Sequence, residues 1–397
     1  MLVLSDKIKH IEESQTLALS GKAKRMKDSG LDVVSLTAGE PDFPTPRHIK
    51  DAAITAIENN FTKYTQNAGS PDLIDAIVRK FTHDNNLYFG HNQILVSAGA
   101  KQSIFNVLQA ICNKGDEVLF FSPYWVSYPE IVKLADATPV AVPTSIENKF
   151  KPDIEQLRKA ITPKTKALII NSPNNPSGVV FSQEDMEAIG SIVKDANIFV
   201  IADEIYEKVV YDNNKHFSIG SIKSLRDNAI TVNGVSKAFS MTGWRVGYAG
   251  GPAAVMEAAA KVQTQVTSNA NSIAQKATVT ALTVPTPDLQ TMVSAFKERR
   301  DFVYERLRSM RDVNVAMPGG AFYFFFDVST LYGKRFQNHV IRNSADMGTY
   351  LLDHHHVATV PGVAFGDDSC LRISYACSLA ELEKGLSRIR TAFEMLA

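Results

Sequence analysis

The sequence has little of what marks secreted, membrane-spanning or nucleic-acid-binding proteins. Only three cysteines occur in 397 residues, at 112, 370 and 377, and this odd number without metal-ligand spacing favours a reducing compartment over a disulfide framework. The apolar start "MLVL" gives way at once to charged residues, and no apolar run reaches the roughly 18 residues of a membrane span. Lys plus Arg and Asp plus Glu both number 42, so no basic excess indicates a nucleic-acid surface. These absences predict a cytoplasmic protein that binds neither membrane nor nucleic acid and acts on a small molecule.

What the sequence does have is an alternation of short apolar runs with amphipathic segments. Several of the runs lack the period-2 pattern of half-exposed strands, as strands covered on both faces should. Between them lie helical patterns such as 182–196, where Ser182 is placed as an N-cap. This alternation predicts an α/β fold with a mostly parallel, seven-stranded sheet between helices. The seven strand-like runs are 93–99, 117–123, 138–143, 166–173, 197–203, 229–234 and 244–251.

The character of the chain changes after about residue 286. A long helical pattern at 287–310 leads into "VNVAMPGGAFYFFFDV", and a second helix–strand–helix set follows. We therefore expect a large domain over 46–286. Residues 1–45 and 287–397 are expected to form a smaller α+β domain that clamps the substrate.

Polar residues follow the apolar runs at the ends where open α/β sheets bind ligands. Gly99-Ala100-Lys101 opens a helix, and the helix start offers N–H groups to an anion. Each of these side chains alone has an ordinary structural reading: Asp203 suits a helix cap, Trp125 a core position and Asn175 a turn. Their joint placement is much harder to obtain by accident. The other residues placed this way are Tyr124, Trp125, Asn174, Asn175, Asp203, Tyr206, Ser236 and Lys237.

This set of groups indicates the ligand. A lysine among anion-binding groups suits a Schiff base with a carbonyl compound. The carboxylate of Asp203 suits a pyridinium nitrogen, the phenol of Tyr206 a phenolic oxygen, and the indole of Trp125 a stacked ring. A phosphate suits Ser236, Arg245 and the helix start. Pyridoxal 5′-phosphate has all four features.

The segment "GVSKAFSMTGWRVG" (234–247) resembles the cofactor-attachment signature of class I aminotransferases, which are fold type I pyridoxal-phosphate enzymes. Further blocks resemble that family, most of all its bacterial-type aspartate aminotransferases, in order along nearly the whole chain. These blocks are "AGEPDFPTP" (38–46), "KYTQNAG" (63–69), "SAGAKQ" (97–102), "PYWVSYPE" (123–130), "NSPNNPSG" (171–178), "ADEIY" (202–206), "PGGAFY" (318–323) and "LRISYA" (371–376).

The resemblance implies a role for each matching residue. Lys237, Asp203 and Tyr206 would be catalytic: Lys237 carries the cofactor and moves a proton, Asp203 keeps the pyridine nitrogen protonated, and Tyr206 donates to the phenolic oxygen. The residues implied to bind the cofactor are Tyr64, Ala100, Lys101, Trp125, Asn175, Asp203, Tyr206, Ser236, Lys237 and Arg245. Those implied to bind the substrate are Gly39, Lys101, Trp125, Asn175 and Arg372, with Arg372 clamping the α-carboxylate.

The resemblance also implies a homodimer with shared sites, in which Tyr64 reaches the neighbour's phosphate. The expected reaction transfers the amino group of L-aspartate to 2-oxoglutarate, with Lys101 facing the distal carboxylate and Ser14 and Thr16 lining that end. Alternatives are an aminotransferase of broader aromatic, alanine or prephenate specificity and a pyridoxal-phosphate-dependent lyase of the same fold. Glu12 stands where prephenate-using relatives tend to have a basic residue, which argues against that side activity.

No metal site is predicted. Three consecutive histidines, 354–356, point in different directions on a helix and are read as a solvated helix end rather than as ligands.

Overall fold

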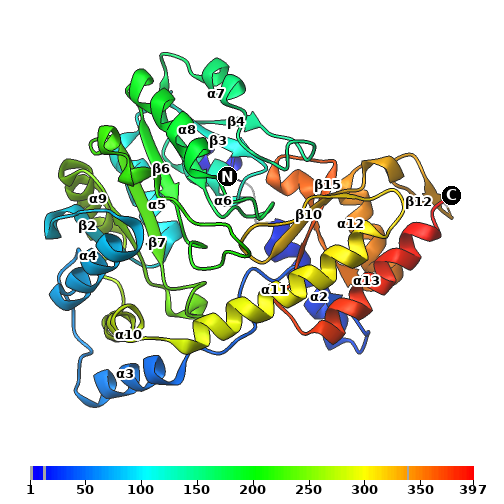
Figure 1. Ribbon diagram of the computed structural model, residues 1–397, viewed down its shortest axis with the longest axis horizontal. Coiled ribbons are helices and arrows are strands. Elements are labelled where there is room, and N and C mark those ends of the chain that lie inside the picture. Colours follow the sequence, from blue (N-terminus) through cyan, green and yellow to red (C-terminus); the bar gives the residue numbers. More distant parts are fainter. Residues whose placement is uncertain (1–2, 12–14, 338) are drawn as a thin grey trace.

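A seven-stranded sheet organises the larger part of the chain (Figure 1). The computed structural model describes residues 3–11, 15–337 and 339–397. β8 runs antiparallel to both of its neighbours and the other pairs are parallel, so the predicted α/β fold with a mostly parallel sheet is confirmed. In spatial order the strands are β2 (Ile94–Ser97), β8 (Gly247–Gly250), β7 (Ala229–Gly234), β6 (Phe199–Asp203), β5 (Thr165–Asn171), β3 (Glu117–Ser122) and β4 (Thr138–Pro143).

Helices cover both faces of this sheet because its strands are apolar on both sides. In β5, Ala167 and Ile169 pack into one apolar cluster, whereas Leu168 and Ile170 pack into another on the opposite face. The first face is covered by α5 (Ala100–Ile111), α6 (Ser127–Leu134) and α9 (Ala253–Val266). The second face is covered by α3 (Arg47–Glu58), α4 (Pro71–Asn85), α7 (Ile154–Ala160), α8 (Gln183–Ala196) and α10 (Ser272–Thr283).

The rest of the chain forms an α+β part around an antiparallel sheet in the order β14-β15-β10-β9. The long helix α11 leads into it from the larger part, and the N-terminal helix α2 lies among C-terminal elements (Figure 1). β1 (Val34–Ser35) pairs with β13 (Val357–Ala358). The remaining elements are α1 (Asp6–Lys9), α2 (Gln15–Asp28), α11 (Pro287–Arg308), β9 (Asn314–Val315), β10 (Tyr323–Asp327), β11 (Arg335–Phe336), β12 (His339–Val340), α12 (Ser344–His355), β14 (Val360–Pro361), β15 (Cys370–Ser374) and α13 (Leu379–Glu394).

Local sequence signals explain where elements begin. Ser182 caps α8 as expected: its hydroxyl accepts from the Asp185 N–H, and the Asp185 carboxylate accepts from the Ser182 N–H. The predicted run 244–251 enters the sheet only at Gly247, because Thr242–Trp244 form a 3-10 turn and Arg245 has a left-handed φ of 56°.

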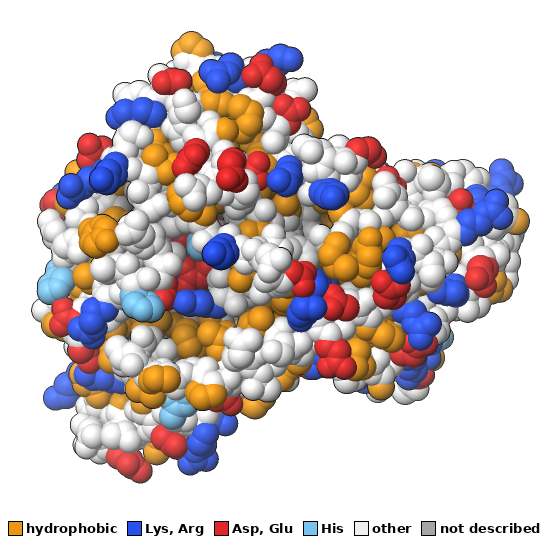
Figure 2. Space-filling model, viewed as in Figure 1, with side chains coloured by type: hydrophobic (Ala, Val, Ile, Leu, Met, Phe, Trp, Pro, Cys, Tyr) orange, Lys and Arg blue, Asp and Glu red, His pale blue; other side chains and the backbone are white. Residues whose placement is uncertain are grey.

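Surface composition agrees with the absence of a strong net charge. On the face drawn in Figure 2, Lys and Arg side chains are interspersed with Asp and Glu over both parts of the molecule. Among the described residues, no helix combines the length and the apolar character needed to cross a bilayer.

Gly247 lets the start of α5 rest directly on the sheet. A Cβ at this position would lie 2.7 Å from Cα of Ala100 and closer still to the backbone nitrogen of Ala100. A methyl group at this position would clash with the backbone of Ala100 unless the first turn of α5 moved. In contrast, a Cβ on nearby Gly243 would meet no atom within 4 Å.

We expect Gly247→Ala to destabilise the protein by about 1–3 kcal/mol, the usual cost of overpacking. Gly243→Ala should change the free energy of unfolding by less than about 0.5 kcal/mol. Urea unfolding of both variants measures the difference. Equal stabilities would contradict the close approach of α5 to β8.

Candidate active site

A cavity of about 630 Å³ opens where the carboxyl ends of the parallel strands meet the start of α5 and the C-terminal part. The ends of β3, β5, β6 and β7 all contribute to it, as expected for an open α/β sheet. Eleven of the predicted site residues line this one cavity: Gly39, Ala100, Lys101, Trp125, Asn175, Asp203, Tyr206, Ser236, Lys237, Arg245 and Arg372.

Tyr64 is the predicted site residue that does not reach the cavity. This residue belongs to the segment that connects α3 to α4 along the chain, and it is 91% exposed. Glu12 and Ser14 lie outside the described residues, and Thr16 is described by its backbone alone.

Lys237 sits just beyond the end of β7 and is half-buried. Its ammonium donates a hydrogen bond to the carbonyl of Gly39 at 2.5 Å. Burial lowers the pKa of Lys237 to about 8, and the positive charges of Arg245 and Arg372 act in the same direction. A larger share of neutral, nucleophilic amine is therefore present near neutral pH than at an ordinary lysine.

Asp203 ends β6 with a carboxylate that is almost completely buried. Oδ2 accepts a hydrogen bond from the hydroxyl of Tyr128 at 2.8 Å, and Oδ1 accepts from the N–H of Ile205 at 3.3 Å. Burial raises the pKa of Asp203 to about 6, although the bond from Tyr128 opposes this shift. A cation placed against the carboxylate would remove the cost of burying its charge.

Arg372 projects from β15 and is 3% exposed. Its guanidinium donates to Oδ1 of Asn175 at 3.0 Å and to the carbonyl of Thr37 at 2.9 Å, while Nε is buried without a partner. Among the described residues, no ion pair joins Arg372 to a carboxylate. A buried guanidinium that bonds only neutral groups is prepared for an anionic ligand.

A second positive region surrounds the start of α5. The guanidinium of Arg245 packs against Gly99, whose φ of 95° and missing Cβ allow the close approach. The Lys101 ammonium lies 4.9 Å from the ring centroid of Trp125, and burial lowers its pKa. The first N–H groups of α5 have no acceptor within the helix. Together with the Ser236 hydroxyl, these donors make an anion site.

Two tyrosines that are not expected from the strand-end pattern complete the site. Tyr323 on β10 shares a 2.9 Å hydrogen bond with the Tyr206 hydroxyl, and its ring lies 4.6 Å from the Arg372 guanidinium. Tyr128 holds Asp203, as described above. Both fall within quoted blocks, "PGGAFY" and "PYWVSYPE". Their roles depend on spatial contacts that strand-end placement does not encode.

The histidine run ends α12 as predicted. His354 is exposed, whereas the ring of His355 lies 3.0 Å from the Tyr350 hydroxyl. Among the described residues, three or more His, Cys, Asp or Glu ligand atoms come together in one place only, at Glu204, Glu207 and His216, away from this run.

Comparison with known proteins agrees with this geometry. Residues 31–389 match the family model "Aminotransferase class I and II". A bifunctional aspartate aminotransferase and glutamate/aspartate-prephenate aminotransferase of Petunia hybrida is 46% identical over 98% of this chain and 82% of its own length. An aspartate/prephenate aminotransferase of Nitrosomonas europaea is 44% identical over 97% of this chain and 98% of its own.

Solved structures give the same picture. The aspartate aminotransferase of Rhizobium meliloti superposes with a TM-score of 0.97 at 40% identity and covers 100% of both chains. That of Thermus thermophilus with maleate gives a TM-score of 0.93 at 41% identity and covers 99% of this chain and 100% of its own. The predicted resemblance is confirmed.

The lowered pKa of Lys237 leads to a pH prediction. Aldehydes react with the neutral amine, so labelling of Lys237 should rise with pH and level off above about 8, whereas exposed lysines should keep rising towards about 10.4. The measurement is reductive alkylation with a small aldehyde, mapped by mass spectrometry on protein freed of bound carbonyl compounds. A pH curve for Lys237 that is parallel to the curve of a lysine-containing model peptide would contradict the assignment.

Proposed function

Because the chain belongs to the class I and II aminotransferase family, we propose that it transfers the amino group of L-aspartate to 2-oxoglutarate, using pyridoxal 5′-phosphate bound at Lys237. The observation that carries the proposal is the convergence of eleven expected site residues on one cavity. The three thiols are free, which supports the expected reducing, cytoplasmic compartment.

The donor set suits this cofactor. Ser236, Arg245 and the start of α5 would hold its phosphate, and the buried carboxylate of Asp203 would face its ring nitrogen. Tyr206 and Asn175 would donate to its phenolic oxygen, because Oδ1 of Asn175 already accepts from Arg372 and its amide nitrogen remains a donor. The indole of Trp125 lies on the same cavity wall and would stack on the ring.

Each residue then has a physical task. When bound, the cofactor supplies an electron sink for the charge left at the substrate Cα. Arg372 fixes the α-carboxylate, and Lys237 takes the proton from Cα because its lowered pKa keeps the amine available as a base. Asp203 holds a proton on the ring nitrogen. Tyr323 orients Tyr206 through their shared hydrogen bond.

The choice of a dicarboxylic amino acid rests on a second cation. Lys101 lines the cavity beside Trp125, where it would meet the distal carboxylate. Three hydroxyls line the cavity with it: the Thr37 hydroxyl lies 2.7 Å from that of Ser20 and 3.0 Å from that of Ser35. The Thermus thermophilus relative is named with maleate, a dicarboxylate, which supports this preference.

Prephenate is a second candidate acceptor for this site. The Petunia hybrida and Nitrosomonas europaea relatives are both named for it. The hydroxyls that line the cavity also suit its polar ring. Prephenate therefore belongs in any substrate panel.

The division of the chain is part of the proposal. Residues 46–286 would form the cofactor-binding domain, and residues 1–45 with 287–397 the domain that clamps the substrate. In support, one apolar cluster of the described residues joins Val34 and Leu36 to side chains between 292 and 396, and its members from the larger part are Tyr206, Val209 and Tyr211. The cavity takes Arg372 and Gly39 from one side and Lys237 from the other.

A half-reaction tests the proposed function. Adding L-aspartate alone to the cofactor-loaded protein should remove the visible absorbance of the cofactor, and 2-oxoglutarate should restore it, as ping-pong transfer requires. Lys237→Ala should abolish turnover. A lyase would release product while the absorbance stays unchanged, and that result would overturn the proposal. Alanine, phenylalanine and prephenate complete the panel.

Lys101→Ala separates the distal-carboxylate role from a phosphate role. Losing one partner of a desolvated charge pair costs about 2–5 kcal/mol, so kcat/KM for aspartate should fall by about 30- to 5000-fold. The values for alanine and phenylalanine should change little. Equal losses for charged and uncharged substrates would leave Lys101 with a role at the phosphate only.

The exposure of Tyr64 fits a homodimer in which each chain completes the other's site. Lys237→Ala and Tyr64→Ala chains should each be impaired alone. A mixed dimer keeps one site with both residues intact, so random mixing should recover about a quarter of wild-type activity. Activity of the mixture no higher than the average of its parents would rule out sharing of Tyr64.

A further inference from the structure

The segment that carries Asp203 and Tyr206 has two functional faces. Asp203 and Tyr206 line the active-site cavity, whereas Glu204 and Glu207 point away from it. The segment is a tight turn, in which the Glu207 N–H donates to the Glu204 carbonyl at 2.9 Å. Residues three apart therefore share a face.

Behind this turn lies a second cavity, of about 170 Å³. Ile205 lines both cavities, so the turn is the wall between them. Lys80 and Glu207 line the rear cavity. Because the rear cavity leaves space behind the turn, the turn could shift into that cavity unless other contacts fix its position.

Glu207 is tethered to the end of α4. One carboxylate oxygen contacts the ammonium of Lys80, and the other accepts a hydrogen bond from the Asn85 amide at 2.7 Å. Lys80 also donates to Oδ1 of Asn85 at 2.6 Å. The side chains of Lys80, Asn85 and Glu207 are all buried.

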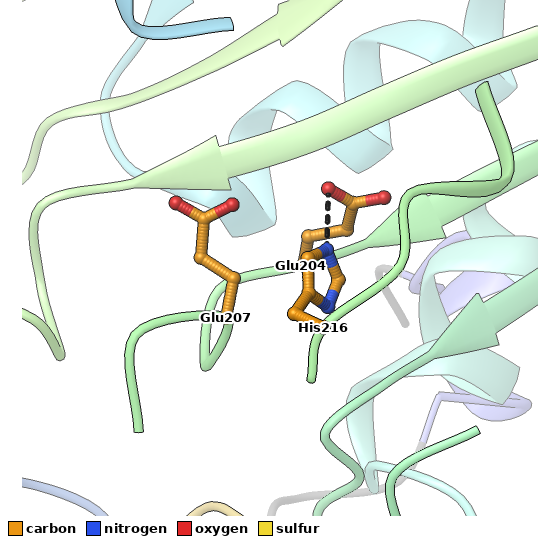
Figure 3. A group of neighbouring side chains, drawn as sticks. All are labelled: Glu204, Glu207 and His216. Atoms are coloured by element: carbon orange, nitrogen blue, oxygen red, sulfur yellow. Dashed lines mark ion pairs between the residues drawn. The ribbon is translucent and has the colours of Figure 1, made fainter. Parts of the chain in front are cut away.

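Glu204 is held by three groups. The Asn85 amide donates to it at 2.9 Å, the Ser218 hydroxyl donates at 2.6 Å, and Nε2 of His216 lies 3.0 Å away (Figure 3). Glu204 is 2% exposed. Asn85 thus connects both carboxylates to the same helix end.

Both carboxylates of this cluster already have partners within the protein. Lys80 contacts Glu207, and the ring of His216 contacts Glu204. Burial by itself lowers the pKa of His216, but Glu204 and Glu207 together outweigh this effect, and the net shift is upward.

We infer that the tether cluster, comprising Lys80, Asn85, Glu204, Glu207 and His216, positions the turn that presents Asp203 and Tyr206 to the cofactor. The inference rests on the cofactor site of the proposed function and not on the choice of substrate. None of the five touches the reacting atoms, so they are positioning residues. Buried ion pairs seldom stabilise more than apolar side chains of the same volume, and their best-attested use is to specify one geometry.

The test compares cofactor-loaded Glu207→Ala with wild type. The pH midpoint of the visible absorbance of bound pyridoxal 5′-phosphate should move by more than about half a unit as Asp203 and Tyr206 shift. The kcat should fall about tenfold or more, with KM within about threefold, since misplacement acts on the chemical step. Glu207→Asp, which keeps both acceptor oxygens and the negative charge that faces Lys80, should recover both values in part.

Lys208→Met is the matched control. Lys208 lies in the same turn and lines the same rear cavity, but it pairs with Asp84 at 2.8 Å. The pH midpoint of the cofactor absorbance and the kcat of Lys208→Met should both match those of wild type. If Glu207→Ala does not fold, Ser218→Ala, which removes one hydroxyl from Glu204, should still move the midpoint measurably from the wild-type value.

A variant that loses thermal stability but keeps the wild-type midpoint and kcat would overturn the inference. The midpoint requires only bound cofactor. A failure of aspartate transfer, seen in wild type itself, is therefore distinguishable from a failure of the tether.

Discussion

Four cations held around one cavity are the constraint on which the rest of the structure depends. The cavity is lined by Lys101, Lys237, Arg245 and Arg372, and both arginines lower the pKa of Lys237. Charges of one sign repel at short range, so the fold must hold them with groups that cannot move away. Neutral carbonyls and amides do this for both arginines. The cavity is thereby complementary to a ligand with more than one negative group.

The sheet supplies the rigidity that this arrangement needs. Parallel strands end at one edge, so side chains far apart in the sequence meet there without a long loop. Gly247 and Gly99 extend this order to the helix start: the first lets α5 approach the sheet, and the second lets Arg245 approach α5. Small residues at these contacts place the positive groups within reach of one another.

Much of the fold and of the candidate site could be predicted from the sequence, because an apolar run followed by polar residues marks the end of a strand. All seven apolar runs became strands of one sheet, and eleven of the residues predicted from strand ends or from the family blocks line one cavity. Tyr128 and Tyr323 were not assigned, because a hydrogen bond between elements leaves no periodic signal. The tether cluster could not be predicted from the sequence either. Lys80 and Glu207 are 127 positions apart, and each alone is typical of an ordinary surface charge.

The hydrogen bond from Lys237 to the Gly39 carbonyl links the reactive amine to the N-terminal segment. An ammonium has three hydrogens to donate, and an amine engaged in a covalent bond to a carbonyl compound has fewer. A covalent bond at Lys237, as the proposed function requires, would remove donors from this contact. The segment between α2 and α3 that carries Gly39 would then be held to the lysine by fewer hydrogen bonds than in the free protein.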